Sequence, residues 1–491
     1  MPKNKPNIIK GAFLAIAMRW TDRFIGLIST IILARLLAPA DFGIIATAWI
    51  VIGLADVLLE MGVWVVLMQT KNPTPAHYDT AWTIRFIQTS IMTVVVLLAA
   101  PLAASYFENP ALTPVIRVLA FVFLLEGLGN IWIITLQKEQ QYTRDFNFVF
   151  IKRIAIFVIT VSGAFLYESY WALVAGNLGG RLTGVLLSYT MHPNRPHFSF
   201  EKFREIFSLS QWVWARSIAQ FFQSRLHEIV VASREAPAVM GAYSLAGQLA
   251  AMPTTELLTP LNRVLFPAFV KVKDDLNELK RVFLLAQGVQ ALIAIPAGVG
   301  MALVADEVVA LMLGEKWLAA VPLVEVLALI GCFTAITSSG FHVLSTLGKF
   351  RITAVYATIQ VAIFAALAYL AFPTAGAQDI SYLRVVMAAL GLISFSIFLC
   401  RELPGLKIRE MLASVIRPAL GAATMFGVLA SLEPQLVVSP ALKLVTEIAI
   451  GTAAYTATVA ITWFLTGRKK GPESYLLEKF SPITRRRLRR D

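Results

Sequence analysis

The chain has 491 residues, of which 57% are hydrophobic and only 15% are charged, and its mean hydropathy is +0.69. A soluble protein carries about 25% charged residues, so this composition excludes an ordinary soluble globular protein. The net charge of +13 could suit nucleic acid, but the basic residues are divided among alternate connectors and no nucleic-acid-binding motif accompanies them. The only cysteines, Cys332 and Cys400, indicate neither a disulfide framework nor a metal site.

Apolar segments long enough to cross a bilayer recur along the whole chain. A hydrocarbon core needs roughly 20 apolar residues per helix. The segments lack the period-2 alternation of a barrel strand, so helices are the expected solution. The sequence therefore predicts an all-α integral membrane protein with about fourteen transmembrane helices, at residues 11–34, 41–66, 82–107, 110–137, 148–166, 170–190, 210–233, 238–262, 282–303, 320–345, 351–372, 379–400, 412–432 and 441–466.

Most of the 43 Lys and Arg residues lie on the N-terminus, on every second connector and on the C-terminus. Cytoplasmic loops of membrane proteins carry such an excess of basic residues. The pattern predicts that both termini lie in the cytoplasm. The basic tail at 467–491 is then expected to contact anionic membrane lipids.

A repeated motif divides the chain into two halves. Pro39-Ala40-x-x-Gly43 precedes the second predicted helix, and Pro237-Ala238-x-x-Gly241 precedes the eighth. Six helices separate the copies, so the halves have the same orientation, which is one plan of secondary transporters. The predicted domains are listed as an N-lobe at 1–190, an amphipathic cytoplasmic linker at 191–209, a C-lobe at 210–400, two additional helices at 401–466 and the tail at 467–491.

The predicted connectors outside the cytoplasm are short, and the longest, near 304–319, has no room for a folded domain. A membrane glycosyltransferase or polymerase usually needs a sizeable aqueous domain. The chain also lacks a G-x-x-x-x-G-K-[ST] nucleotide motif, a Ser/His/Asp set and metal-ligand spacing. We expect no enzyme activity, no cofactor and no bound metal.

Arginines inside the predicted helices are the first candidate site residues, because charged groups in a membrane usually mark a pathway. Several share a helix face with other polar residues at intervals of three and four. Guanidinium groups remain charged in a low dielectric and bind phosphate in bidentate fashion, so a cavity lined by them would suit a diphosphate. The candidates are Arg19, Arg23, Arg85, Arg181, Arg216 and Arg225.

Acidic residues inside the helices are candidates for coupling transport to an ion such as a proton. These are Asp56, Glu60, Glu228 and Glu256. The alternative interpretation is that the arginines and acids pair structurally, for example Arg19 with Asp22 and Arg225 with Glu228, which are three residues apart. The sequence leaves both interpretations open.

Two stretches resemble a known family. Residues 31–43, ending in Leu37-Ala38-Pro39-Ala40-Asp41-Phe42-Gly43, resemble the opening signature of Wzx-type polysaccharide flippases, in the multidrug/oligosaccharidyl-lipid/polysaccharide exporter superfamily. Residues 241–246 and 260–269 resemble the eighth helix of that family and its following basic loop.

The resemblance implies two six-helix lobes that form a V around a cationic central cavity and work by alternating access. It also implies a polyprenyl-diphosphate-linked oligosaccharide as cargo, moved from the cytoplasmic to the periplasmic leaflet of a bacterial inner membrane. The expected pathway is exopolysaccharide, O-antigen or capsule assembly, with a polysaccharide polymerase and glycosyltransferases as partners. The alternatives are an ion-coupled exporter of amphiphilic small molecules, a membrane enzyme, and a non-transporting component of a polysaccharide synthase complex.

Overall fold

The computed structural model describes residues 8–59, 66–68, 70, 72–208, 211–432, 439–467 and 471–475. Within these ranges the chain is helical and contains no β-strand. The helices form two compact units, Met1–Gly241 and Ala242–Asp491, which we describe separately. The predicted division into lobes at 1–190 and 210–400 stays a prediction.

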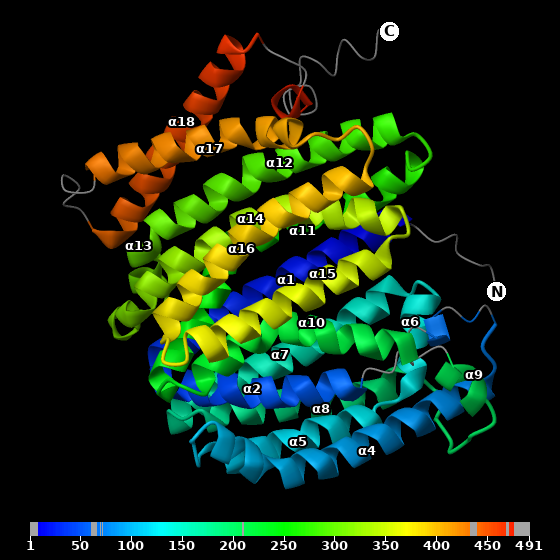
Figure 1. Cartoon of the computed structure of the whole chain (residues 1–491). Coiled ribbons are helices and arrows are strands. Elements are labelled where there is room, and N and C mark those ends of the chain that lie inside the picture. The colour runs from blue at the N-terminus through cyan, green and yellow to red at the C-terminus, as the bar shows by residue number, and fades with distance from the viewer. Residues whose placement is uncertain are drawn as a thin grey trace. The chain divides into compact units, whose positions relative to one another are not determined.

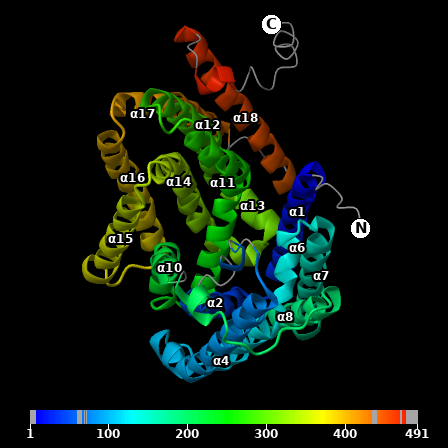
Figure 2. The ribbon, with the colours of Figure 1, turned by 90° about the vertical axis from the view of Figure 1, so that its right-hand side faces the viewer.

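The first unit is a bundle of long helices (Figure 1). Its helices are α1 (Ile8–Leu36), α2 (Pro39–Leu59), α4 (Pro75–Tyr106), α5 (Leu112–Leu128), the 3-10 turn η1 (Ile131–Ile133), α6 (Ile134–Lys138), α7 (Tyr142–Tyr167), α8 (Trp171–Met191), α9 (Phe203–Ser208), α10 (Gln211–Ala232) and the first turn of α11 (Pro237–Lys271). Helix α7 lies beside α1 and α8 (Figure 2). Helices α4 and α5 pack together, and α10 packs on α2.

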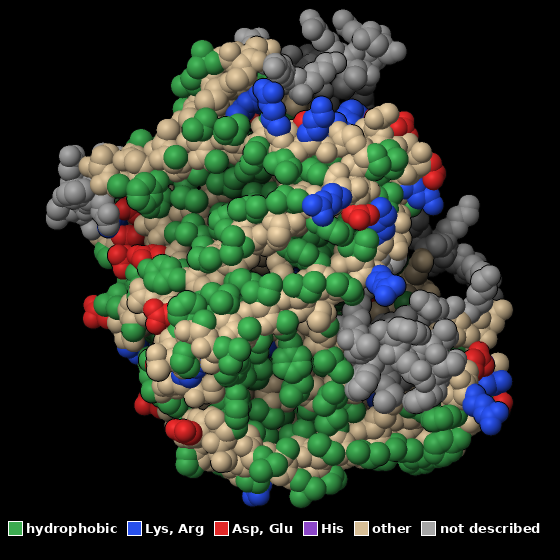
Figure 3. Space-filling model, viewed as in Figure 1, with side chains coloured by type: hydrophobic (Ala, Val, Ile, Leu, Met, Phe, Trp, Pro, Cys, Tyr) green, Lys and Arg blue, Asp and Glu red, His purple; other side chains and the backbone are tan. Residues whose placement is uncertain are grey.

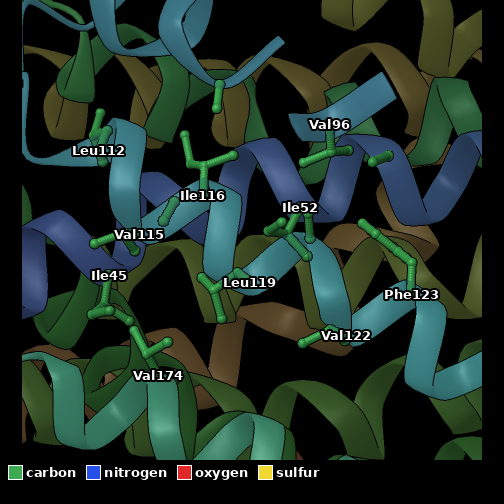
Figure 4. Close-up of a cluster of buried hydrophobic side chains, with 14 of the residues drawn as sticks. Ile45, Ile52, Val96, Leu112, Val115, Ile116, Leu119, Val122, Phe123 and Val174 are labelled. Atoms are coloured by element: carbon green, nitrogen blue, oxygen red, sulfur yellow. The ribbon is translucent and has the colours of Figure 1, made fainter. Parts of the chain in front are cut away.

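A buried apolar cluster fixes the positions of α2, α4, α5 and α8 (Figure 4). Leu112, Val115, Ile116 and Leu119 form one stripe of α5 and have no exposed surface. They meet Ile52 of α2 and other apolar residues of the cluster. Side chains at intervals of three and four lie on one helix face, so this stripe packs α5 against α2, α4 and α8.

The second unit is also a helix bundle. After α11 it contains α12 (Leu276–Leu303), α13 (Ala305–Met312), the 3-10 turn η2 (Glu315–Ala320), α14 (Val321–Thr346), α15 (Phe350–Ala366), the π-helical turn η3 (Leu367–Ala371), α16 (Ala377–Glu402), α17 (Ile408–Leu432) and α18 (Pro440–Leu465). Helix α12 packs on α14 and α17. The buried Gln290 of α12 donates to Asn262 Oδ1 at 2.8 Å and to Ser338 Oγ at 3.0 Å, so a polar contact joins three helices inside this unit.

Each predicted membrane segment overlaps a helix of the structure. Among the described residues, nine helices pass a test of length and hydropathy for membrane spans, or ten if the bent pair α5 and α6 is one span. The exact number of fourteen is thus not confirmed. Helices α1, α8, α10 and α11 fall outside the nine, and all four carry charged candidate site residues. Hydrophobic side chains cover much of the face shown in Figure 3, as expected for lipid contact.

The predicted helix at 110–137 is wrong as a single helix, because α5 and the α6 region meet at a bend of 69°. Asn130 causes the break. Its side chain accepts from Trp132 N at 3.1 Å and donates to Asn194 O at 2.8 Å, and its backbone N–H donates to Ser188 Oγ at 2.9 Å. Asn commonly caps helices in this way, and Asn130 is 1% exposed.

The predicted amphipathic linker at 191–209 packs on α4. The His197 N–H donates to Asp79 Oδ1 at 3.1 Å, and the Ser199 N–H donates to Thr83 Oγ1 at 3.0 Å. Ile206 of α9 has no exposed surface, whereas Phe200 is 59% exposed. The sequence places Phe200 and Ile206 on one apolar stripe of this predicted amphipathic linker. The structure divides the stripe, because Ile206 packs into the protein whereas Phe200 is exposed and available to lipid.

We expect Ile206→Asp to destabilise the protein, since a carboxylate would replace a fully buried side chain beside Trp82. The cost should be about 3 kcal/mol or more, seen as a clear drop in the melting temperature of the purified protein. Phe200→Asp is the matched control and should leave that temperature nearly unchanged. Equal destabilisation by both changes would contradict the division of the stripe.

The two copies of the repeated motif contact each other at the starts of α2 and α11. A Cβ added to Gly43 would overlap the carbonyl group of Pro237, and a Cβ added to Gly241 would overlap the carbonyl group of Pro39. Each glycine thus faces the proline that begins the other helix. Only glycine allows backbones to approach so closely, which explains its place in both copies.

Candidate functional site

An ion-pair network joins α4, α5 and α8 in the first unit. Arg85 Nη2 of α4 lies 2.6 Å from Glu126 Oε1 of α5, and Arg181 Nη1 of α8 lies 3.1 Å from Glu126 Oε2. One carboxylate therefore holds two guanidinium groups. Each guanidinium has five N–H donors, and the structure records one hydrogen bond from each to Glu126.

A second ion pair lies on α1 and α7, with Arg153 Nε 3.0 Å from Asp22 Oδ1. Lys152 connects the two pairs, because it interacts electrostatically with Arg181 and Glu126 as well as with Asp22 and Arg153. Its aliphatic chain packs over Gly184 of α8, where an added Cβ would lie 3.2 Å from Lys152 Cδ. We call these six residues the basic cluster; they are Asp22, Arg85, Glu126, Lys152, Arg153 and Arg181.

Three residues of the basic cluster lie well inside their helices, whereas Glu126 lies near the end of α5 (Leu112–Leu128). Arg85 and Lys152 each lie ten residues after the start of their helices, and Arg181 lies ten residues before the end of α8. Successive long helices alternate in direction, so these three residues share one level, about 15 Å from the helix ends. A charged group at this depth is costly unless it is paired or serves a function.

Positive charge is in excess in the basic cluster. Three arginines face two carboxylates, and Lys152 adds another basic group. The side chains of Arg85, Arg153 and Arg181 are 31–39% exposed, so ligand could reach them. Guanidinium groups that share a carboxylate retain free N–H donors, and these suit the oxygens of a phosphate or diphosphate.

The other predicted arginines lie outside this network. Arg225 Nη1 of α10 lies 2.6 Å from Glu228 Oε2, which is the local pair that the spacing suggested. The local pair of Arg19 with Asp22 is wrong, because Asp22 pairs with Arg153. Arg19 and Arg23 are on α1, and Arg23 is the more exposed. Arg216 is on α10, and its side chain is outside the described part of the structure.

The four acids proposed for ion coupling do not gather at one place in the first unit. Asp56 is exposed on α2, and Glu228 is engaged with Arg225 on α10. Glu256 is on the part of α11 that belongs to the second unit. Glu60 lies outside the described residues. No group of three or more His, Cys, Asp or Glu among the described residues could hold a metal ion.

Sequence reasoning missed Lys152 and Arg153 as site residues. The helix was predicted to begin at 148, which places both at a helix end, where basic residues only set topology. In the structure α7 begins at Tyr142, so both lie three turns inside it. The signal that could have found them is the pair of basic residues interrupting an otherwise apolar run.

Comparison with known proteins decides the family. Residues 32–322, more than half of the chain, match the family described as Polysaccharide biosynthesis protein. The chain belongs to this family. It is 28% identical over 316 residues to the lipopolysaccharide biosynthesis protein WzxC of Escherichia coli (strain K12), with 64% of each chain covered. It is 22% identical over 411 residues to the teichuronic acid biosynthesis protein TuaB of Bacillus subtilis (strain 168), covering 82% of this chain and 84% of TuaB.

A solved structure supports the fold of this polysaccharide biosynthesis protein. The lipid II flippase MurJ in an inward closed conformation superposes with a TM-score of 0.74, covering 92% of this chain and 99% of MurJ at 12% identity. At this identity the likeness concerns the fold alone. The multi-pass helical architecture predicted from the sequence, and its resemblance to a polysaccharide biosynthesis family, are thereby confirmed.

Proposed function

We propose that this polysaccharide biosynthesis protein is a flippase, which moves a polyprenyl-diphosphate-linked oligosaccharide from the cytoplasmic to the periplasmic leaflet of a bacterial inner membrane. The product would feed exopolysaccharide, O-antigen or capsule assembly, with a polymerase and glycosyltransferases as partners. Alternating access between lobes at 1–190 and 210–400, with both termini cytoplasmic, is part of the proposal. The matches to WzxC and TuaB support the pathway, and the MurJ-like fold is consistent with a transport role rather than an enzymatic one.

The observation that carries the proposal is the bridging of Arg85 and Arg181 by Glu126 on membrane helices. A network built only to neutralise charge would match its carboxylates to its basic groups, and this one does not. In the structure, Glu126 holds both guanidinium groups in place. A diphosphate would compete with Glu126 for their N–H donors, with Lys152 and Arg153 adding positive potential nearby.

The lipid chain need not enter the polar region. Only the diphosphate and the glycan require shelter from hydrocarbon, because polar groups are costly to bury without partners. The polyprenyl chain can remain in the bilayer while the headgroup moves along the helices. No step of this process transfers a chemical group, so the basic cluster acts by binding and releasing the charged headgroup.

Glu126→Gln separates a binding role from a structural one. The change removes a negative charge and keeps the size and one acceptor, so binding of undecaprenyl diphosphate should be retained or become several-fold tighter. Arg181→Gln should weaken the same binding by about tenfold, the worth of a charge-assisted hydrogen bond. Binding can be measured by native mass spectrometry on protein in nanodiscs of neutral lipid.

Undecaprenol, which lacks the diphosphate, is the ligand control and should respond to neither change. If Glu126→Gln lost undecaprenyl diphosphate binding as fully as Arg181→Gln, the network would be a structural pair and the proposal would fail.

A further inference from the structure

A polar cavity lies in the first unit at the far end of α4 from the basic cluster. It has a volume of about 370 Å³ and is bounded by the α4–α5 turn, the α10–α11 turn and Thr47 of α2. From Arg85 to Phe107 the chain runs 22 residues along α4, or about 33 Å. The cavity is thus a separate place from the basic cluster. Its volume falls in the range of small-ligand sites, about 300–1,000 Å³.

The lining favours a ligand rich in hydroxyl groups over an anion. Two acidic residues, Glu108 and Glu235, and one basic residue, Arg234, are among those that line the cavity. Asn109 adds an amide that can donate and accept, and Phe107 adds an aromatic ring. Carboxylate and amide groups can each bond two neighbouring hydroxyls, and a ring can cover an apolar sugar face. With two acidic residues and one basic residue, the lining does not favour a diphosphate.

The backbone of Glu108 has a conformation that is unfavourable for a residue with a side chain. Its φ angle is +50°, in the left-handed region that favours glycine, and it follows the end of α4. The turn is fixed by hydrogen bonds from Asn109 N to Ala104 O at 2.9 Å and from Ala111 N to Asn109 Oδ1 at 3.1 Å. Glycine is the usual residue at this position of a helix end.

We propose that this cavity binds an uncharged sugar unit of the oligosaccharide cargo on the extracytoplasmic side. The inference rests on the proposed function and on the predicted topology, which places the turns at 107–112 and 232–237 outside the cytoplasm. The diphosphate binds at the basic cluster, and the glycan binds here, at the other end of the same helices. Because the diphosphate and the glycan bind at different levels, the glycan has a binding site on the extracytoplasmic side after translocation.

Glu108→Gly tests the proposal without harming the fold, because glycine adopts a positive φ at no steric cost. The probe is the oligosaccharide released by mild acid from the lipid-linked pool of the strain that carries the gene. Its binding to the full-length protein in nanodiscs is measured by saturation-transfer NMR. Glu108→Gly should weaken binding by about tenfold, as loss of a charge-assisted hydrogen bond predicts, while the melting temperature stays equal or rises.

Glu168→Gly is the matched control, since Glu168 also ends a helix, has φ of +45° and does not line the cavity. It should leave binding unchanged. The proposal is overturned if wild-type protein gives no signal with the released oligosaccharide, or if both glycine variants bind it equally. Ala236→Trp, which places a large side chain at the cavity wall, should also reduce the signal.

The proposed function is tested separately by the same proteins. Arg181→Gln should weaken binding of undecaprenyl diphosphate and leave binding of the released oligosaccharide unchanged, and Glu108→Gly should do the reverse. If Glu108→Gly alone leaves oligosaccharide binding unchanged, the sugar site is refuted and the flippase proposal stands. If Arg181→Gln alone leaves undecaprenyl diphosphate binding unchanged, the diphosphate site is refuted and the sugar site stands.

Discussion

Replacing both Arg85 and Arg181 by Gln should abolish surface polysaccharide in a strain that depends on this protein. The double change leaves the Glu126 carboxylate facing an incoming diphosphate without the two guanidinium groups that it now holds at 2.6 and 3.1 Å. The electrostatic attraction between the basic cluster and the diphosphate at Glu126 would become repulsion. Two charge-assisted hydrogen bonds are lost, so the polysaccharide should fall by about 100-fold.

The measurement is complementation of a deletion strain, with polysaccharide quantified per amount of protein in the membrane. Lipid-linked oligosaccharide should accumulate on the cytoplasmic side at the same time. Arg281→Gln is the control, because that side chain is 69% exposed and bonds only to nearby Glu278 in the described structure. A double variant with normal membrane levels and normal polysaccharide would refute a role of the basic cluster in transport.

Adding one methyl group at Gly241 should have the largest effect on assembly of the protein. The new Cβ would overlap the carbonyl group of Pro39, which is backbone and cannot rotate away. Overpacking of this kind costs about 1–3 kcal/mol, and more where backbone must move. Gly43→Ala should act in the same way, through the carbonyl group of Pro237.

Gly247→Ala is the matched control on the same helix, since nothing lies within 4 Å of its added Cβ. Alanine favours a helix over glycine by roughly 0.5–1 kcal/mol, so this variant should be equal to or more stable than the wild type. The melting temperatures of the three purified variants decide the question. If Gly241→Ala and Gly247→Ala behaved alike, the close approach of α2 and α11 would not matter for stability.

The location of the helices could be predicted from the sequence because lipid imposes a simple condition. Each span must be apolar and about 20 residues long, which hydropathy detects without knowledge of any partner. The residues at which helices begin and end were harder to predict from the sequence. The start of α4 at Pro75 depends on a cap in which Thr74 Oγ1 lies 2.7 Å from His77 Nδ1, and hydropathy does not register such a cap.

The candidate site could be predicted only in part. Arg85 and Arg181 were found because an arginine within an apolar helix is conspicuous. Their shared partner Glu126 was not among the predicted site residues, and Lys152 and Arg153 were missed altogether. Which acid meets which arginine depends on the packing of α4, α5, α7 and α8, because Glu126 lies 41 residues from Arg85 and 55 from Arg181 in the chain.

The sequence by itself determined the membrane class, the helical architecture and the presence of costly arginines, because each follows from the local cost of placing polar groups in hydrocarbon. The repeated motif can also be read directly from the sequence. Only the tertiary structure decided that Asp22 pairs with Arg153, that one carboxylate bridges Arg85 and Arg181, and that the two repeated glycines contact each other's helices. The physical reason is that pairing energy depends on distances of a few ångströms between side chains of different helices. Those distances are set by how the helices pack, and no single helix contains that information.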